Sequence, residues 1–414
     1  MKIKIRKRYL FFVLAFSSAL ISAILAGVDS YVQLFIENPW VFGLSLFIVT
    51  LFITILISLI LSIPIKGKSL GALSIDPTFK KVRLIRKEEL LYHILAGAGN
   101  AVLTTGYFIL LSMLRDPSVV LPFSQVAILY LVIIESIVEK NNPTLVEAQS
   151  AIIVTLGAIL GSISLTGTIS LKALAVVFLV INPGWVLLSI YQRKLKLMKL
   201  KDVKNDAINI RLYNVVFALI FTIIFVAAYD LISGNNTLYE SVVVSFQYFH
   251  FLALIGIGTF ISFIFYIRAL GIGKASVTQA VRSSIIIFSI PVSIILGMIG
   301  IIDPLSTDPI ILLIKFIGIS IMILGILSFA LTLTKAYILI KMKPGIPIDE
   351  TMKRLWEING VNRVCAVSGQ YDFIIKIRTR TLVKGYERIL RKVESIEGVE
   401  EFKWNSVLKD WEDI

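Results

Sequence analysis

Long apolar stretches, each about as long as a helix that crosses a lipid bilayer, recur along the chain up to residue 333. A hydrocarbon core about 30 Å thick needs about 20 apolar residues in a helix. Ten stretches approach that length: residues 8–28, 41–64, 90–112, 118–138, 147–166, 170–191, 211–232, 245–267, 276–299 and 309–333. The pattern therefore predicts a polytopic α-helical membrane protein with ten spans, because a helix leaves no backbone group unpaired in lipid.

The long apolar pattern ends near Thr334, and a pattern typical of a water-soluble α+β domain follows. Strands are predicted at 337–342, 361–367, 372–377 and 399–408, and amphipathic helices at 348–358 and 382–396. The order βαββαβ is ferredoxin-like. We therefore expect two domains, a transporter-like membrane domain over residues 1–334 and a soluble domain over residues 335–414.

The positive charges are concentrated at alternate ends of the predicted spans. The chain is 57% apolar and only 16% charged, with a net charge of +14. Before Lys335, 22 of the 26 lysines and arginines lie at the same side as the N-terminus. This asymmetry follows the positive-inside rule, so it predicts a multi-pass protein of the cytoplasmic (plasma) membrane with both termini in the cytoplasm. The charges then mark topology and contact lipid, and we expect no nucleic-acid partner.

Catalytic and metal-binding patterns are absent from the sequence. The single cysteine, Cys365, excludes an intrachain disulfide, and the distant His93 and His250 form no metal-binding cluster. No phosphate-binding loop, zinc motif or catalytic triad pattern is found. We therefore expect neither an enzyme nor a bound cofactor or metal.

Two sets of apolar spans share sequence features in the same order. Residues 95–100 match residues 254–259, and Tyr107 and Tyr266 follow at equal distances. Residues 118–119 then match 276–277, and residues 156–157 match 324–325. The matches divide the domain into repeats of five spans, about 8–166 and 170–333. An odd number of spans makes the second repeat inverted, as in many secondary transporters.

The span count, the loop pattern and the segments 117–160 and 273–297 are similar to those of the drug/metabolite transporter superfamily, EamA-type. This resemblance covers about residues 8–333. It implies two five-helix halves and a substrate cavity lined by spans 1–4 and 6–9, with spans 5 and 10 outside it.

Polar side chains inside the predicted spans are candidates for lining this cavity, because an unpaired polar group is costly in lipid. Arg282, beside Gln279, suits a carboxylate or phosphate, although its side chain could instead reach the membrane surface. Amides such as Gln125 also join helices to one another, and Asn182-Pro183-Gly184-Trp185 interrupts span six either at the site or as a simple kink. Near the cytoplasmic end of span four, Glu135 is a possible proton relay. The substrate-cavity candidates are Asn100, Tyr107, Gln125, Asn182, Trp185, Tyr266, Gln279 and Arg282.

The soluble tail resembles the ligand-binding domain of the leucine-responsive/AsnC regulators. The resemblance rests on Y-x-L-I-x-x-x-P-G at 337–345, G-x-Y-D at 369–372 and Gly398-Val399. It implies dimerisation and amino-acid binding near the turn, where Gly369, Tyr371 and Asp372 are the matching effector-binding candidates. A purely structural turn, with glycine for its geometry and Asp372 as its cap, is the alternative. No helix-turn-helix precedes the tail, so DNA binding is not expected.

Together these features predict a secondary transporter of small organic metabolites with a cytoplasmic regulatory domain, and the tail favours amino acids or related compounds as the substrate. Its expected partners are membrane lipid, a small-molecule substrate, an amino-acid effector and a second copy of the chain. Two alternatives stay open. The protein could be a non-transporting, membrane-anchored amino-acid sensor or assembly platform, or its tail could serve only for dimerisation.

Overall fold

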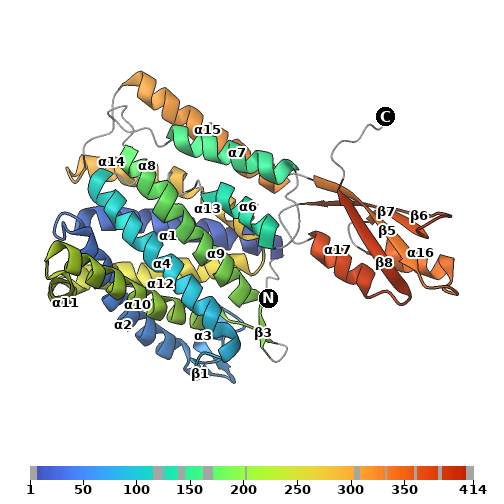
Figure 1. Ribbon diagram of the computed structural model, residues 1–414, viewed down its shortest axis with the longest axis horizontal. Helices are drawn as coiled ribbons and strands as arrows, with labels where there is room; N and C mark the ends of the chain where they lie inside the picture. Colours follow the sequence, from blue (N-terminus) through green and yellow to red (C-terminus); the bar gives the residue numbers. More distant parts are fainter. Residues whose placement is uncertain are drawn as a thin grey trace. The chain divides into compact units, whose positions relative to one another are not determined.

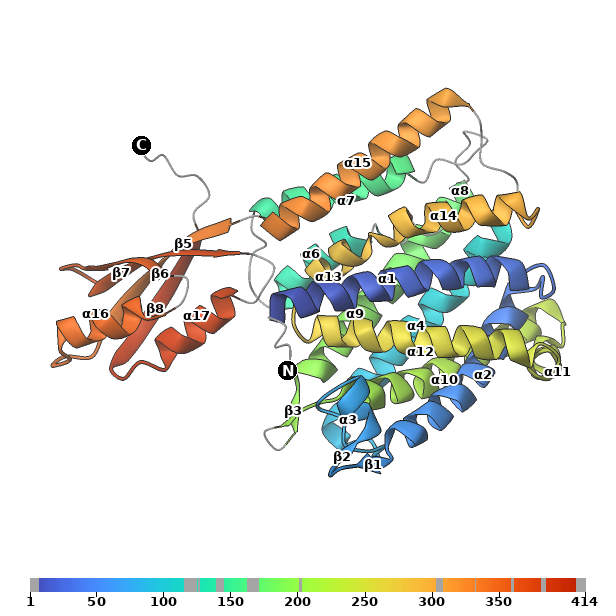
Figure 2. The same cartoon turned by 180° about the vertical axis from the view of Figure 1, so that it is seen from behind.

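A computed structural model of the chain describes residues 7–114, 125, 127–138, 145–161, 171–200, 203–302, 308–331, 333–358, 361–380 and 385–406. The chain divides into two compact units (Figures 1 and 2). The helical unit contains Met1–Asn142 and Ala151–Ile326, and the sheet unit contains Pro143–Ser150 and Leu327–Ile414.

Helices dominate the first part of the chain, and each of the ten apolar stretches contains at least one. The helices are α1 (Lys7–Val32), α2 (Pro39–Leu61), α3 (Leu70–Ser74), α4 (Lys87–Leu114), α6 (Ala127–Val138), α7 (Leu145–Gly161), α8 (Leu171–Val176), α9 (Asn182–Leu197), α10 (Ala207–Ser233), α11 (Thr237–Gln247), α12 (Phe249–Leu270), α13 (Ala275–Arg282), α14 (Ile285–Met298) and α15 (Pro309–Leu331). Short hairpins pair β1 (Pro64–Ile65) with β2 (Lys68–Ser69), and β3 (Lys199–Leu200) with β4 (Val203–Lys204).

Six helical segments among the described residues are long and apolar enough to cross a membrane. They are Tyr9–Val32, Pro39–Leu61, Lys87–Leu114, Ala207–Ser233, Phe249–Leu270 and Ala275–Met298. Ala148–Gly157 and Pro309–Gly325 are apolar but shorter. The membrane-type helical architecture is therefore confirmed, whereas the number of ten spans stays a prediction.

Local sequence signals set several helix ends. The Asn38 side chain accepts a hydrogen bond from Trp40 N at the start of α2, where Pro39 occupies the first turn. The Asp206 carboxylate accepts one from Asn209 N at 2.7 Å and caps α10. Gly234 ends α10 with a φ of 69°, a conformation that glycine adopts without steric cost.

Helix packing in the two proposed halves follows one scheme. Helix α4 packs against α9 and α10, and α12 packs against α1 and α2. Helix α14 packs against α1, and α6 against α9. If the chain is divided between α7 and α8, each contact in this list has a counterpart related by exchange of the two halves. The α4–α9 contact corresponds to α12–α1, the α4–α10 contact to α12–α2, and the α6–α9 contact to α14–α1.

The matched glycines lie where these helices approach closely. A Cβ on Gly99 would lie 2.6 Å from the backbone nitrogen of Leu188 in α9, and one on Gly258 would lie 2.6 Å from the Leu25 side chain in α1. Gly97 faces Phe217 in α10, and Gly256 faces Thr50 in α2. Small residues therefore permit the corresponding contacts in both halves.

Helices α7 and α15 lie side by side at one edge of the helical unit (Figures 1 and 2). A Cβ on Gly157 would lie 2.5 Å from the Met322 backbone nitrogen, and one on Gly325 would lie 2.6 Å from the Val154 side chain. The matched glycines thus form one helix–helix seam.

The interruption expected at Asn182 is not observed, because span six is continuous through this point. A π-helical turn, η2 (Val177–Ile181), joins α8 directly to α9, and Asn182 N donates to Val177 O. This wider turn accommodates Pro183 in the first turn of α9, where a missing N–H is tolerated. Span nine is the one that bends: α13 ends at Arg282, Ser283 and Ser284 form a turn, and α14 begins at Ile285.

The sheet unit has the predicted ferredoxin-like order. Its elements are β5 (Leu333–Met342), α16 (Ile348–Trp356), β6 (Val361–Ala366), β7 (Phe373–Arg380), α17 (Gly385–Glu394) and β8 (Val399–Ser406). All strand pairs are antiparallel, in the order β6-β7-β5-β8, and Ile338 lies opposite both Ile375 and Trp404. Leu355 is buried with Ile338 and Ile375, whereas the next residue, Trp356, is 59% exposed. Thr351, Leu355 and Ile358 lie on the buried face, four and three residues apart.

Candidate functional site

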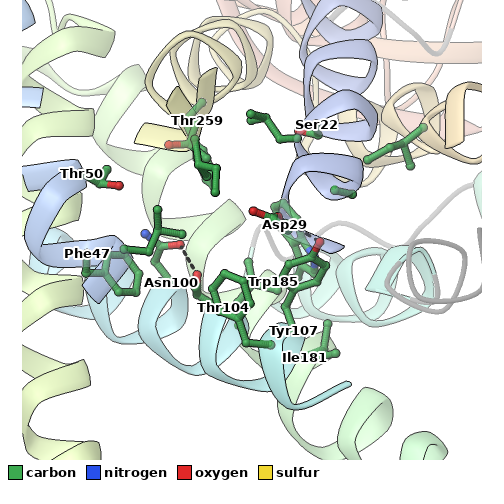
Figure 3. Close-up of a pocket in the computed structure, with 18 of the residues that line it drawn as sticks. Ser22, Asp29, Phe47, Thr50, Asn100, Thr104, Tyr107, Ile181, Trp185 and Thr259 are labelled. Carbon is green, nitrogen blue, oxygen red and sulfur yellow. Dashed lines mark hydrogen bonds between the residues drawn. The ribbon is translucent and has the colours of Figure 1, made fainter. Parts of the chain in front are cut away.

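A cavity of about 140 Å³ lies inside the helical unit. Figure 3 shows Asp29 beside Tyr107, with Thr50, Asn100, Thr104 and Thr259 around the same space. The walls combine apolar and aromatic groups with a few polar ones, as is typical of small-molecule sites. The lining comprises Ser22, Leu25, Ala26, Asp29, Leu46, Phe47, Thr50, Asn100, Leu103, Thr104, Tyr107, Phe108, Gln125, Ile181, Trp185, Arg211, Ile255, Thr259, Phe263, Arg282 and Ile285.

Arg282 is held in this wall by neutral groups. Its side chain is only 4% exposed, so it does not extend to the surface. Nε donates to Ser18 Oγ at 3.2 Å, and Nη2 donates to Ser22 Oγ at 2.8 Å. The guanidinium lies 4.6 Å from the Trp185 ring centre and 5.2 Å from that of Tyr266. These cation–π contacts and hydroxyls orient the cation without neutralising it.

A second arginine, Arg211 in α10, also lines the cavity. It is buried, with its guanidinium 4.2 Å from the Phe263 ring centre. Nη1 is 3.4 Å from Asn214 Oδ1, and Nε has no hydrogen-bond partner. In the charge pattern Arg211 belongs to the basic residues at the head of span seven. Its position one turn into a predominantly apolar helix is the signal that could have identified it.

Asp29, near the end of α1, is the acidic residue of the cavity wall. Its carboxylate accepts a hydrogen bond from Tyr107 Oη at 3.0 Å on Oδ2, whereas the buried Oδ1 has no partner. The first predicted span ends at residue 28, one residue before Asp29, whereas α1 continues to Val32 and includes it.

The cavity's amide groups join helices. Asn100 donates to Asn214 Oδ1 at 2.9 Å, which connects α4 to α10. Gln125 accepts from Gln279 Nε2 at 3.0 Å and from Ser283 Oγ at 3.1 Å. Asn100 and Gln125 thus line the cavity and also make the helix–helix hydrogen bonds expected of buried amides.

Three predicted residues lie outside the cavity lining. Gln279 donates to Gln125, and Tyr266 is hydrogen-bonded through its hydroxyl to Ser189 Oγ at 2.6 Å. Asn182 is buried and neither polar atom of its amide has a hydrogen-bond partner. The structure therefore brings together Asn100, Tyr107, Gln125, Trp185 and Arg282 of the eight candidates.

Glu135 in α6 caps α13. Its carboxylate accepts hydrogen bonds from Ala275 N at 2.6 Å, Ser276 N at 3.1 Å and Ser276 Oγ at 2.5 Å. Arg193 Nη1 lies 3.7 Å from the same carboxylate. A negative charge at the positive end of a helix is stabilising, so Glu135 fixes the start of the helix that carries Arg282.

A polar network, which we call the Asp76 network, connects segment 76–89 with segment 196–209. Lys196 Nζ lies 2.7 Å from Asp76 Oδ2, which also accepts from Ala207 N at 2.7 Å. Arg83 pairs with Glu89 at 2.6 Å, and Asn205 Nδ2 donates to Glu89 at 2.5 Å. Burial raises the pKa of Asp76, but the Lys196 ammonium and the backbone hydrogen bonds outweigh it, so that the pKa lies below its ordinary value. The network therefore ties the two proposed halves together at one end of the helices.

The effector-binding candidates lie in the turn between β6 and β7. Gly369 has a φ of 148°, which disfavours any residue with a Cβ. Asp372 Oδ2 accepts from Met342 N at 2.7 Å, and Asp372 N donates to Ile340 O. Tyr371 is half-buried. Gly369 and Asp372 thus have clear structural roles, and an effector role for the three residues stays a prediction.

Comparison with known proteins identifies the tail. Residues 335–413 match the family described as "Lrp/AsnC ligand binding domain". The HTH-type transcriptional regulator LysM of Saccharolobus solfataricus (strain ATCC 35092 / DSM 1617 / JCM 11322 / P2) is 29% identical over 77 residues. The alignment covers 19% of this chain and 54% of LysM, so the chain spans about half the length of this curated relative.

Two solved structures are similar to parts of the chain. The crystal structure of PH0061 matches 32% of this chain and 76% of its own, with 18% identity and a TM-score of 0.19. A second solved protein, which carries no specific name, matches 77% of this chain and 95% of its own, with 12% identity and a TM-score of 0.45. Neither likeness carries an argument at these TM-scores. The family match and the strand order together show that the C-terminal part of the chain is a Lrp/AsnC ligand-binding domain.

Proposed function

We propose that the protein is a secondary transporter of small organic metabolites with a cytoplasmic ligand-binding domain of the Lrp/AsnC type. The observation that carries this proposal is the cavity, which is lined by both proposed halves and contains buried charged groups. Three of those groups are Asp29, Arg211 and Arg282. Buried charges are costly in a membrane protein and typically mark a substrate pathway.

The packing scheme supports an EamA-type architecture of two inverted five-helix halves. Exchange of the halves relates the α4–α9 contact to the α12–α1 contact, and matched glycines line both. Such halves can rock about a central site and expose it to either side of the membrane. The cavity lining includes helices from spans 1–4 and 6–9, in agreement with the predicted arrangement.

The conformation fits a state closed toward the cytoplasm. In the proposed topology, the basic segments that contain the Asp76 network are cytoplasmic. Asp29 and Tyr107 lie near the C-terminal ends of α1 and α4, which are the ends away from the cytoplasm in this topology. The cavity therefore extends from Arg211, just after segment 196–209, toward the outer side, and rupture of the Asp76 network would accompany its opening to the cytoplasm.

Transport can be tested by counterflow in vesicles reconstituted with the full chain. We expect uptake of at least one member of a panel of amino acids and organic acids, and loss of most of that uptake in Arg282→Ala. Lys172→Ala is the matched control, because Lys172 is an exposed cation in α8. Absence of counterflow for the whole panel would overturn the proposal.

The tail favours a second candidate function, that of a membrane-anchored sensor. The tail matches the Lrp/AsnC ligand-binding family, and domains of this type bind amino-acid effectors and oligomerise. In the transporter, an effector would change flux only by binding the tail differently in the two conformations. Amino-acid binding that persists in Arg282→Ala, in a protein that moves no amino acid across the vesicle membrane, would favour the sensor instead.

A further inference from the structure

We propose that the cavity binds an amino acid with two carboxylate groups, so that its net charge is −1. This inference deepens the proposed function by naming the substrate class. It rests on the two arginines and one aspartate in the cavity wall, and it does not use the tail.

The first step is the charge of the cavity. Arg211 and Arg282 form no ion pair with any acidic side chain among the described residues. Their neighbours are serine, asparagine and aromatic groups. Two buried cations without acidic partners require compensation, and guanidinium groups bind carboxylates through paired hydrogen bonds. A ligand with two carboxylates supplies one for each arginine.

The second step is the cavity's acidic group. Asp29 has one carboxylate oxygen bonded to Tyr107 and one buried oxygen without a partner. A ligand ammonium would supply the missing donor and an opposite charge. With Arg211, Arg282 and Asp29, the lining carries a formal charge of +1, which an amino acid with two carboxylates neutralises.

The third step is size and spacing. Cavities of about 150 Å³ hold benzene, so the 140 Å³ here suits a ligand of about six to ten non-hydrogen atoms. The Arg282 guanidinium is bonded to Ser22, which lies seven residues before Asp29 in α1 and thus about 10 Å away along the helix. An amino acid with two carboxylates and four or five carbons can bridge that separation, because the side chains of Arg282 and Asp29 extend toward it from the two ends.

Binding can be measured with the purified full chain through the protection of an engineered cysteine. The parent variant is Cys365→Ser, which removes the only native cysteine, and Thr104→Cys places a thiol in the cavity wall. This readout reports the cavity and not the tail. We expect L-glutamate or L-aspartate to slow maleimide labelling at concentrations at least tenfold lower than glutarate, L-glutamine or inorganic phosphate.

Variants of the charged residues then assign the ligand's groups. We expect Arg282→Gln and Arg211→Gln each to weaken protection by glutamate at least tenfold, with partial recovery in Arg282→Lys. Asp29→Asn should remove most of the advantage of glutamate over glutarate, because only glutamate has an ammonium group. Lys172→Gln is the control cation and should change nothing.

Several outcomes overturn this inference. Equal protection by glutarate would remove the role of Asp29, and equal protection by glutamine or phosphate would remove the requirement for two carboxylates. Protection by none of the probes would also refute it. If glutamate protects the cavity but is not moved in vesicles, the transport proposal fails and the binding site stands. If another class of metabolite is transported and glutamate gives no protection, the transport proposal stands and the inference about the bound ligand fails.

Discussion

Arg282 and Glu135 illustrate how single charged residues are fixed in the helical unit. Arg282 is oriented by two serine hydroxyls and two aromatic rings, while Glu135 caps the same short helix, α13, at its other end. The cap determines where α13 begins, and α13 determines where Arg282 lies. The position of the arginine therefore depends on a carboxylate from the other half of the chain.

Replacement of Glu135 by glutamine should destabilise the protein by about 1–2 kcal/mol. Glutamine retains one acceptor oxygen, but it loses the negative charge that faces the α13 N-terminus and Arg193. The measurement is the melting temperature of the purified full chain. Glu397→Gln serves as the control, because Glu397 is exposed in the turn between α17 and β8. An unchanged melting temperature in Glu135→Gln would mean that the cap contributes nothing.

At the scale of elements, close approach of helices at glycines explains the matched packing of the two halves. The seam between α7 and α15 is one such close approach, since Gly157 faces the backbone of Met322. Here a side chain cannot be accommodated by a change of rotamer, because the opposing atom belongs to the main chain. The two helices must move apart instead.

Gly157→Ala should therefore destabilise the protein, although alanine normally favours a helix by about 0.5–1 kcal/mol over glycine. The added Cβ would lie 2.5 Å from Met322 N. Gly43→Ala is the matched control, because a Cβ there lies 3.6 Å from Phe108, an ordinary contact. Melting temperatures of the two variants should move in opposite directions, and a stabilised Gly157→Ala would contradict the seam.

At the scale of the whole chain, the Asp76 network joins segments more than 100 residues apart. Its stabilising effect depends on the ionised form of Asp76, whose pKa is lowered in the folded protein despite burial. The contribution is therefore fully present above the ordinary pKa of 3.8 and is lost as the pH falls through the lowered value.

Asp76→Asn should lower the melting temperature most at pH 7, where the native side chain is charged and paired with Lys196. Below its ordinary pKa of 3.8 the carboxyl of the unfolded protein takes up a proton, while the folded protein keeps the charge down to the lowered pKa. The difference between the two proteins should therefore shrink as the pH falls through this range. Melting curves of both proteins at pH 7, 5 and 3.5 provide the test. A difference that stays constant across this range would show that the charge of Asp76 does not matter.

The sequence predicted the tail more completely than the cavity, and for physical reasons. Strand alternation, the glycine turn at Gly369 and the short helices are local features, so the ferredoxin-like order followed from them. Asp29 and Arg211 lie within two turns of helix ends, where a sequence pattern does not separate a loop charge from a buried one. Pro183 marks an irregularity in span six, but the sequence does not distinguish a broken helix from a π-helical turn in a continuous one. No proline or glycine marks the turn at Ser283 and Ser284.

The sheet unit is attached to the preceding helix through an interior strand. One residue separates Leu331 of α15 from Leu333 of β5, and β5 is hydrogen-bonded to β7 on one side and to β8 on the other. A pull along this connection loads two antiparallel ladders in shear, so many hydrogen bonds must break together. An edge strand would instead peel away one bond at a time. The attachment is thus mechanically suited to bear tension between the helix and the sheet without unravelling the fold.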